Sequence, residues 1–258
     1  MTSTRLGPGD FAIPRAEAPR LEPGEVHVWA IDLDPPQQQA AALRPLLSTD
    51  ERERADSFRF DRHRRRFIVT RAATRRLLGA YGERAPASVE ITYGANGKPS
   101  VLDEPELEFN LSHSEDKALV AVSRSGPVGV DIERLRPLDD ADDIARRFFS
   151  RREVKTYLAQ PEALRPRAFF NGWTRKEAVV KALGEGLFLS LQRFDVSLES
   201  DAPARILAID GRAAEARAWE LCALEPEAEF VGALATPWRP DRVLGFAAGR
   251  QLEALPRS

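Results

Sequence analysis

Residues 128–133 read VGVDIE, and at this segment the order of predicted elements along the chain begins again. The segment alternates apolar and polar positions, which is the pattern of a half-buried β-strand. Side chains two residues apart lie on the same face of a strand, so Asp131 and Glu133 project together while Val130 and Ile132 face a core. The pattern predicts a strand that presents two carboxylates side by side.

A second segment, residues 173–181, reads WTRKEAVVK. Trp173, Glu177 and Lys181 are spaced four residues apart, so they form one line on the face of a helix. The tryptophan can pack into a core, the carboxylate can bind a metal ion or take a proton, and the ammonium can meet a phosphate oxygen. Together with the two acids of the strand, these residues predict a divalent-metal site for phosphate chemistry, for which magnesium is the usual ion.

Each segment alone has a plainer interpretation. Two acids on a strand are most often part of a solvated sheet face. Glu177 and Lys181 are most often a surface ion pair worth about 0.3–0.5 kcal/mol, and Trp173 at helical spacing is usually a core residue. The functional hypothesis therefore depends on the combination.

The composition is that of an ordinary globular protein, with 43% hydrophobic and 30% charged residues among 258. A net charge of -2 argues against a protein that binds polyanions through its overall charge. The apolar runs are too short to span a membrane, and the first residues lack a secretory signal pattern. Cys222 is the only cysteine, which excludes an internal disulfide and a multi-cysteine zinc site. A cytoplasmic enzyme is the simplest class.

The order of predicted elements occurs twice. After a proline-rich, extended lead-in over residues 1–24, Ser48 and Glu51 form the cap pattern of a helix that opens at residue 50. The first round consists of a strand at 26–33, helices at 37–47 and from 50, a long helix at 62–81, and strands at 89–93, 108–112 and 118–122. The second round consists of a strand at 128–133, helices at 144–149, 151–159 and 165–183, and strands at 194–198, 219–221, 231–234 and 244–246.

An offset of about a hundred residues between the two rounds indicates an internal duplication. We therefore predict an α+β fold with two similar α/β subdomains, residues 25–126 and 127–258, related by a pseudo-two-fold axis. Each subdomain would pack a small, mainly antiparallel sheet on a long helix. Two such units would meet along a central cleft, where sites commonly form.

Other residues supply donors for phosphate groups. Asn96 and Gly97 predict a turn that carries Lys98, and Ser112 and His113 end a predicted strand. The long first-half helix contains several arginines, and residues 62–66 read RHRRR. Alone, such a lysine usually belongs to a turn, a lone histidine is usually structural, and an arginine-rich helix face is usually solvated. Together they predict binding of several phosphates at a point separate from the metal.

In order along the chain, five motifs resemble those of the larger, pseudodimeric 4′-phosphopantetheinyl transferases, the Sfp type. They are GKP at 97–99, FNLSHS at 109–114, GVDIE at 129–133, WTRKEAVVK at 173–181 and GEGL at 184–187. The resemblance covers residues 48–198. It implies a magnesium-dependent enzyme that transfers the 4′-phosphopantetheine arm of coenzyme A to a serine of an apo acyl or peptidyl carrier protein and releases adenosine 3′,5′-bisphosphate. The carrier would serve fatty acid, polyketide or nonribosomal peptide synthesis.

The resemblance also implies roles for the residues of the second half. Asp131, Glu133 and Glu177 would hold magnesium on the coenzyme A pyrophosphate, and Asp131, Glu177 and Lys181 would be catalytic. Glu177 would take the proton of the carrier serine, directly or through water, and Lys181 would stabilise charge on the pyrophosphate. Residues 184–187 would close the substrate side. Phosphoryl transfer depends on positioning and charge neutralisation, so no nucleophile of the enzyme is required.

By the same resemblance, the first half would hold coenzyme A. Lys98 and His113 would contact its 3′-phosphate, with Ser112 beside the phosphates. Three arginines would line the adenosine 3′-phosphate end, namely Arg54, Arg71 and Arg75.

Glu51 departs from the family pattern. An acid stands here at a position that we align with a basic phosphate contact of the family. The departure predicts that this contact is missing or has moved to Arg52 or Arg54.

Two other functions fit parts of the sequence. A magnesium-dependent nuclease also combines acids with a lysine, and it would need a continuous basic groove and show strong salt dependence. A non-catalytic carrier-protein or nucleic-acid binding module would use the arginines at 62–66 and would not need three acids to converge. The transferase prediction includes a monomer that binds an acidic carrier through a basic surface, with no nucleic-acid or membrane partner.

Overall fold

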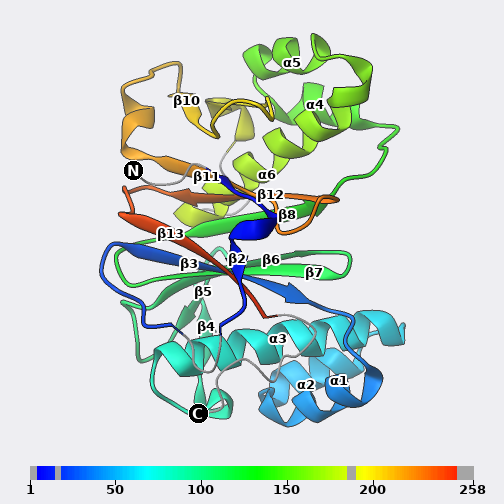
Figure 1. Cartoon of the computed structure of the whole chain (residues 1–258), viewed down its shortest axis with the longest axis vertical. Helices are drawn as coiled ribbons and strands as arrows, with labels where there is room; N and C mark the ends of the chain where they lie inside the picture. The colour runs from blue at the N-terminus through cyan, green and yellow to red at the C-terminus, as the bar shows by residue number, and fades with distance from the viewer. Residues whose placement is uncertain (1–4, 15–18, 185–189, 249–258) are drawn as a thin grey trace.

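The computed structural model describes residues 5–14, 19–184 and 190–248, and these form four layers (Figure 1). Two β-sheets lie face to face in the middle of the molecule. The helices of the first half cover the outer face of one sheet, and the helices of the second half cover the outer face of the other. This arrangement confirms the predicted α+β class.

Both halves follow one order of elements. The first half consists of β3 (Glu25–Asp32), α1 (Gln37–Leu43), α2 (Thr49–Asp56), α3 (Asp61–Tyr81), a hairpin of β4 (Ile91–Tyr93) and β5 (Pro99–Val101), β6 (Glu108–Ser114) and β7 (Lys117–Ser123). The second half consists of β8 (Gly129–Arg134), α4 (Ala141–Phe148), α5 (Arg151–Leu158), α6 (Arg165–Leu183), a hairpin of β9 (Phe194–Val196) and β10 (Ile206–Ile209), β11 (Glu220–Leu224) and β12 (Phe230–Thr236). The repeated order confirms the predicted pair of similar subdomains.

The helices α2 and α5 begin with the same motif. Ser48 and Glu51 form a capping box at α2, and Ser150 and Glu153 form one at α5. A capping box gives side-chain acceptors to backbone N–H groups that the first helical turn leaves unpaired. Both glutamates are buried, and each forms an ion pair with the long helix of its own half. The motif therefore starts a short helix and fixes it to the long one.

The sheets take strands from outside the repeated units. One sheet has the order β2-β13-β3-β7-β6 and the other β1-β11-β12-β8. The last strand, β13 (Arg242–Ala247), pairs in parallel with β3 of the first sheet. The lead-in forms β1 (Arg5–Leu6), parallel to β11, and β2 (Phe11–Ala12), parallel to β13. The first sheet thus contains one strand from residues 127–258 and one from the lead-in.

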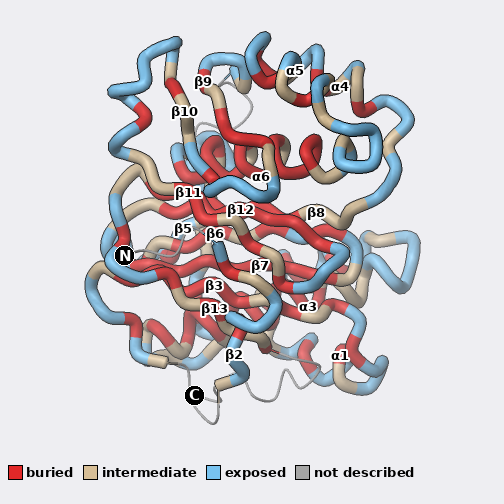
Figure 2. The backbone as a smooth tube through the Cα atoms, turned by 45° about the horizontal axis from the view of Figure 1, so that its top comes forward, coloured by how far each residue is buried: buried red, intermediate tan, exposed pale blue. Residues whose placement is uncertain are grey.

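A continuous apolar core fills the space between the sheets, and both sheets appear largely buried in Figure 2. It combines side chains of both halves, the lead-in and β13: Leu6, Phe11, Val26, Val28, Val130, Ile132, Leu234 and Val243. Burial of this apolar surface accounts for the extra strands at the sheet edges. The two halves therefore meet through a packed core, and the predicted central cleft does not run between the sheets.

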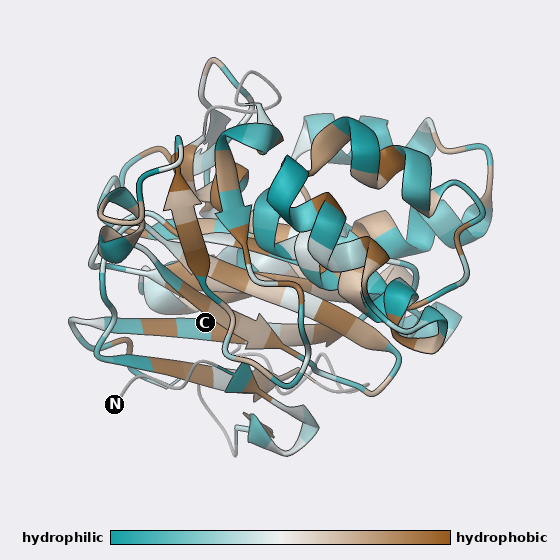
Figure 3. Ribbon diagram, turned by 90° about the horizontal axis from the view of Figure 1, so that it is seen from above, coloured by the Kyte–Doolittle hydropathy of each residue, from teal (hydrophilic) through white to brown (hydrophobic). Residues whose placement is uncertain are grey.

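The outer layers are amphipathic. Figure 3 shows hydrophobic strands beneath helices whose outward turns are largely hydrophilic. None of the helices within the described residues is both long and apolar enough to cross a membrane.

Candidate functional site

The outer strands β6 and β8 meet along one side of the molecule, where the two sheets come together. Two serines of β6 reach the two acids of β8. Ser112 donates to Oδ1 of Asp131, and Ser114 donates to Oε2 of Glu133, each at 2.7 Å. The predicted acids of the second half are therefore held by hydroxyl groups of the first half.

Helix α6 packs against β8 and contributes a second set of side chains to the site. The ammonium of Lys181 donates to Oδ1 of Asp131 at 2.7 Å and to the hydroxyl of Ser112 at 3.0 Å. The helix lies close to the strand because Gly129 has no side chain; a Cβ atom there would lie 2.0 Å from the carbonyl oxygen of Ala178. The structure thus brings the predicted strand acid and helix lysine together.

The acids of the site affect one another's protonation. Burial raises the pKa of Asp131, while Lys181 and Ser112 oppose that rise. Glu177 is half-buried, and its pKa is raised by burial and then by the charge of Asp131. Glu133 raises the pKa of both acids further. Because Lys181 and, at 3.3 Å from Glu133, Arg136 face three carboxyl groups, the site favours an additional cation.

The donor set fits a magnesium ion. Oδ2 of Asp131 is buried and has no hydrogen-bond partner among the described residues, so one oxygen of this acid is available as a ligand. Carboxylate oxygens are the protein ligands that magnesium prefers. In the described part of the chain, no three His, Cys, Asp or Glu side chains are grouped closely enough to hold an ion as they stand. Binding by Asp131, Glu133 and Glu177 therefore requires these carboxylates to draw together.

A basic cavity lies beside this cluster. His113 follows Ser112 on β6 and so faces the opposite side of the strand. There it lines a cavity of about 430 Å³ together with the basic side chains of α3, which are Arg62, His63, Arg66 and Arg71. Burial and the charge of Lys181 lower the pKa of His113. The basic lining suits an anionic group.

Glu51 has a structural role that sequence reasoning missed. Its carboxylate accepts the Nε–H of Arg71 and that of Arg75, each at 2.6 Å. Arg75 is only 3% exposed and also donates to the carbonyl of Val89 at 2.7 Å. Its position does not support the predicted contact with the adenosine 3′-phosphate end, because its donors fix α2 and the segment after α3. Arg71, in contrast, also lines the cavity.

The two arginines predicted to replace the contact at Glu51 differ in their surroundings. Arg52 donates to the carbonyl of Leu47 at 2.6 Å and to the hydroxyl of Thr49 at 3.1 Å, which ties it to the start of α2. Arg54 is exposed, and its guanidinium carbon lies 5.5 Å from the ring centroid of Phe58. Because Phe58 lines the cavity, Arg54 is the better placed of the two.

Lys98 lies at the end of the β4–β5 hairpin, where the first half meets the end of α6. Its ammonium donates to the carbonyl of Ala182 at 3.0 Å and pairs with Glu108 at 3.2 Å. The nearby Asn96 donates to the carbonyl of Gly184 at 3.1 Å. The hairpin therefore satisfies carbonyl groups that the last helical turn leaves unpaired. Lys98 does not line the basic cavity.

Sequence reasoning missed Ser114 and Asn96. Ser114 could have been found, because it shares a strand face with Ser112, whereas the contact of Asn96 depends on how the halves are placed. Trp173 packs against the rings of Phe148 and Phe169, as its helical spacing indicates.

Residues 185–187, predicted to close the substrate side, lie outside the described residues.

Family models match both repeated halves. The model of the 4′-phosphopantetheinyl transferase superfamily matches residues 127–235. A second model, described as 4′-phosphopantetheinyl transferase, N-terminal, matches residues 32–125. The border between the two matched ranges falls directly before β8.

The chain is similar to curated proteins over most of their lengths. It is 39% identical to the 4′-phosphopantetheinyl transferase HetI of Nostoc sp. over 222 residues, which are 84% of this chain and 90% of HetI. It is 35% identical to psf-1 of Bacillus pumilus over 69% of this chain and 78% of that protein. It is 28% identical to Sfp of Bacillus subtilis over 69% of this chain and 80% of Sfp.

A solved structure, the holo-[acyl-carrier-protein] synthase of Thermotoga maritima, superposes on 42% of this chain and 61% of its own chain. The TM-score is 0.31 and the sequence identity 22%. This superposition is too limited to bear on the arrangement of the two halves.

Proposed function

The chain belongs to the 4′-phosphopantetheinyl transferase family, and from this premise we propose how its residues perform the transfer. The enzyme transfers the 4′-phosphopantetheine arm of coenzyme A to a carrier protein. Family membership decides against the nuclease and the binding module. Our proposal is that Asp131, Glu133 and Glu177 hold magnesium on the pyrophosphate of coenzyme A, with Lys181 beside them.

One observation carries this proposal. Oδ2 of Asp131 is buried and has no partner among the described residues, while Oδ1 is bound by Lys181 and Ser112. Leaving a buried carboxylate oxygen unpaired costs about 1–3 kcal/mol or more. A fold keeps such an atom at a functional site when a ligand completes its coordination.

The chain's own residues then carry the proton transfer and stabilise charge. Glu177 lies beside the other two acids, and we assign its carboxylate as the group that accepts a proton. Glu177 takes the hydroxyl proton of the carrier serine as the serine oxygen bonds to the β-phosphorus. The bond from that phosphorus to the bridging oxygen breaks, and Lys181 stabilises the charge that leaves on adenosine 3′,5′-bisphosphate. Magnesium, when bound, neutralises the pyrophosphate.

We assign the basic cavity to the nucleotide end of coenzyme A. Arg62 and His113 line a space of about 430 Å³. Arg66 and Arg71 also line it, and they form ion pairs there with Asp34, Glu115 and Glu51. A planar guanidinium binds phosphate oxygens through two parallel hydrogen bonds. The 3′-phosphate would enter this cavity, one strand face away from the metal-binding acids.

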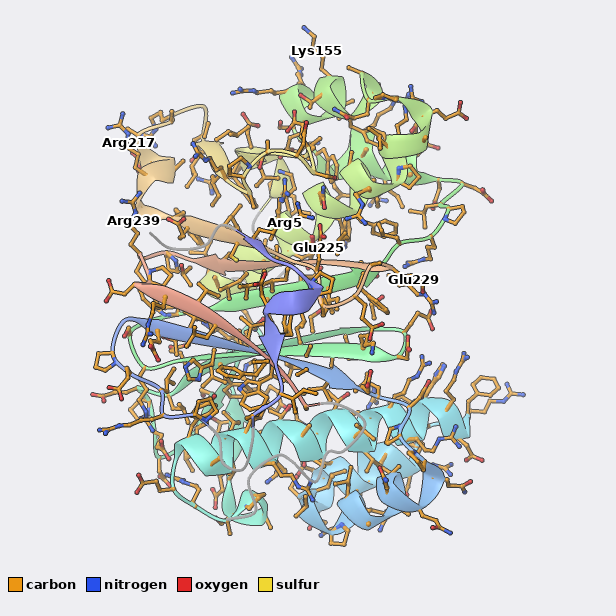
Figure 4. All side chains as sticks on the ribbon, viewed as in Figure 1. Arg5, Lys155, Arg217, Glu225, Glu229 and Arg239 are labelled. Carbon is orange, nitrogen blue, oxygen red and sulfur yellow. The ribbon has the colours of Figure 1, made fainter. Side chains whose placement is uncertain are left out.

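The helices α4 and α5 offer a surface for an acidic carrier protein. Arg151 borders a hollow of about 600 Å³ at the junction of these helices, where Arg146 pairs with Asp142 and Asp143 of its own helix. Lys155 of α5 projects away from the body of the molecule above them (Figure 4). Positive charge here would steer an acidic carrier toward the site.

A mass measurement tests the proposed function. The protein is incubated with coenzyme A, magnesium and several apo carrier proteins, and the carriers are weighed. We expect one carrier to gain the mass of phosphopantetheine. A folded enzyme that modifies none of the carriers would contradict the proposal.

Glu177→Gln tests the role of Glu177 as base. The amide cannot take a proton, so we expect turnover to fall by about 10²-fold or more while the circular dichroism spectrum is unchanged. Glu162→Gln, in the turn before α6, is the control, since Glu162 is exposed and remote from the acids. Near-normal turnover in Glu177→Gln would remove this residue from the mechanism.

A further inference from the structure

Strand β6 contacts β8 through a row of polar side chains. At alternate positions on one face of β6 lie Asn110, Ser112 and Ser114. The side-chain oxygen of Asn110 accepts the backbone N–H of Val130 at 2.9 Å. The two hydroxyls that follow contact the acids. Since all three side chains are largely buried, the row forms a fixed contact between the two halves.

The two hydroxyl groups have defined proton directions. Lys181 donates to the oxygen of Ser112 at 3.0 Å, and the backbone N–H of Arg134 donates to the oxygen of Ser114 at 3.2 Å. A serine hydroxyl has one proton. Because each oxygen already accepts a hydrogen bond, each proton is given to the carboxylate on its other side.

Each hydroxyl binds only one oxygen of its carboxylate. Asp131 uses Oδ1 for Ser112 and Lys181 and keeps Oδ2 unpaired. Glu133 uses Oε2 for Ser114 and, at 3.3 Å, for Arg136, and its Oε1 takes no hydrogen bond from the residues that the structure describes. Both acids are therefore fixed in rotation with one oxygen left for a ligand.

We propose that Ser112 and Ser114, here called the serine pair, are positioning residues that fix Asp131 and Glu133 for metal binding. The inference rests on the proposed function, because it takes these acids as magnesium ligands. Neither serine touches the metal. The pair lowers the cost of binding, since the two carboxylates have less rotational freedom to lose when they draw together around the ion.

The same contacts give the first half a part in the chemistry of the second. The acids belong to β8, whereas the groups that fix them belong to β6. Residues 127–258 alone would therefore contain the proposed metal ligands but would lack the serine hydroxyls that orient them.

Manganese binding, measured by electron paramagnetic resonance without coenzyme A or carrier, tests the proposal. Ser114→Ala removes one hydroxyl, whose only side-chain hydrogen bond among the described residues is with Glu133. We expect manganese affinity to fall roughly 10-fold, with a matching rise in the magnesium concentration for half-maximal rate. Ser114→Thr keeps a hydroxyl and should restore both values.

Ser123→Ala is the matched control. Ser123 is a buried serine of the neighbouring strand β7, and its hydroxyl donates to the backbone carbonyl of Glu25 at 3.2 Å, outside the site. This variant should keep the manganese affinity of the unchanged protein. A loss of equal size in both serine variants would mean a general effect on the fold and would overturn the proposal.

Asp131→Asn separates failure of the inference from failure of the proposed function. If Asp131→Asn leaves manganese binding intact, the assignment of the metal site is wrong and the inference falls with it. If Asp131→Asn abolishes binding and Ser114→Ala does not weaken it, only the role of the serine pair is wrong.

Discussion

At the scale of single residues, Glu51 shows how an acid can stabilise the fold beside the arginines of α3. It is 4% exposed and accepts hydrogen bonds from Arg71 and Arg75. Its pKa lies below the usual value because the two arginines and the capping hydrogen bond from Ser48 outweigh the effect of burial. The acid replaces a predicted phosphate contact with a link between α2 and α3.

Glu51→Gln should therefore destabilise the protein. The change leaves two buried guanidinium groups without a countercharge, which costs about 3 kcal/mol. Urea denaturation followed by circular dichroism measures the loss. Glu53→Gln is the control. Glu53 lies two residues after Glu51 on the exposed side of α2, so this change should alter stability by less than about 0.5 kcal/mol. Equal stability of the two variants would contradict the structural role.

His27 gives stability a pH dependence of defined sign. Its ring is fully buried, with Nδ1 2.7 Å from the hydroxyl of Tyr81 and Nε2 3.1 Å from Glu25. Burial lowers its pKa, so the unfolded chain binds a proton near pH 6.5 before the folded chain does. The contribution of His27 is thus present above about pH 6.5 and is lost as the pH falls through the lowered folded-state pKa.

The melting temperature between pH 7.5 and 5 tests this prediction. We expect the difference between the unchanged protein and His27→Gln to shrink as the pH falls. His63→Gln, an exposed histidine of α3, should follow the curve of the unchanged protein. A constant difference between the unchanged protein and His27→Gln would contradict a neutral buried ring.

The shared faces of the proposed catalytic residues could be predicted from sequence because they depend on local spacing. Asp131 and Glu133 lie two residues apart on a strand, and Glu177 and Lys181 lie one turn apart on a helix. The roles of Arg75 and Lys98 could not, because they depend on contacts with Val89 and Ala182, far away along the chain. Spacing fixes which side chains share a face, but not what lies opposite that face.

At the scale of elements, the close contact of α6 with β8 sets the geometry of the site. A Cβ atom at Gly129 would lie 2.0 Å from the carbonyl oxygen of Ala178 and 2.3 Å from the backbone nitrogen of Ala182. These are backbone atoms, so they cannot move aside without moving the helix.

Gly129→Ala should push α6 away from β8. We expect a loss of stability of at least about 1–3 kcal/mol and lower activity, because Lys181 would leave Asp131. Thermal unfolding and the carrier-modification rate measure the two effects. Gly9→Ala adds the same methyl group where no atom lies within 4 Å and should change neither. Unchanged activity in Gly129→Ala would show that the close contact is not needed.

Long elements with a clear hydrophobic period could be predicted from sequence, whereas the short strands could not. The helix at 62–81 and the strand at 26–33 have long patterns and appear as α3 and β3. β10 was not predicted, and β1 and β2 were read only as an extended lead-in. Two-residue strands carry too little pattern to be recognised, and the apolar core between the sheets is what orders them.

At the scale of the whole molecule, contacts at several places join the halves. β13 extends the first sheet from the second half, and the serine pair links β6 to β8. The lead-in passes from one sheet to the other, and Arg5 of β1 lies beside Glu225 with an ion-pair distance of 2.7 Å (Figure 4). The halves repeat one order of elements, but neither half has a complete sheet of its own.

The two halves should therefore unfold together. Trp29 is buried in the core of the first half and Trp173 packs in that of the second. Variants that keep only Trp29 or only Trp173 of the four tryptophans in the chain therefore report each half separately. We expect both to show the same urea midpoint, because loss of either half exposes the core between the sheets. Circular dichroism of each variant controls for altered stability. Separate midpoints, with each half losing its own signal, would mean that the shared core and β13 do not couple the halves.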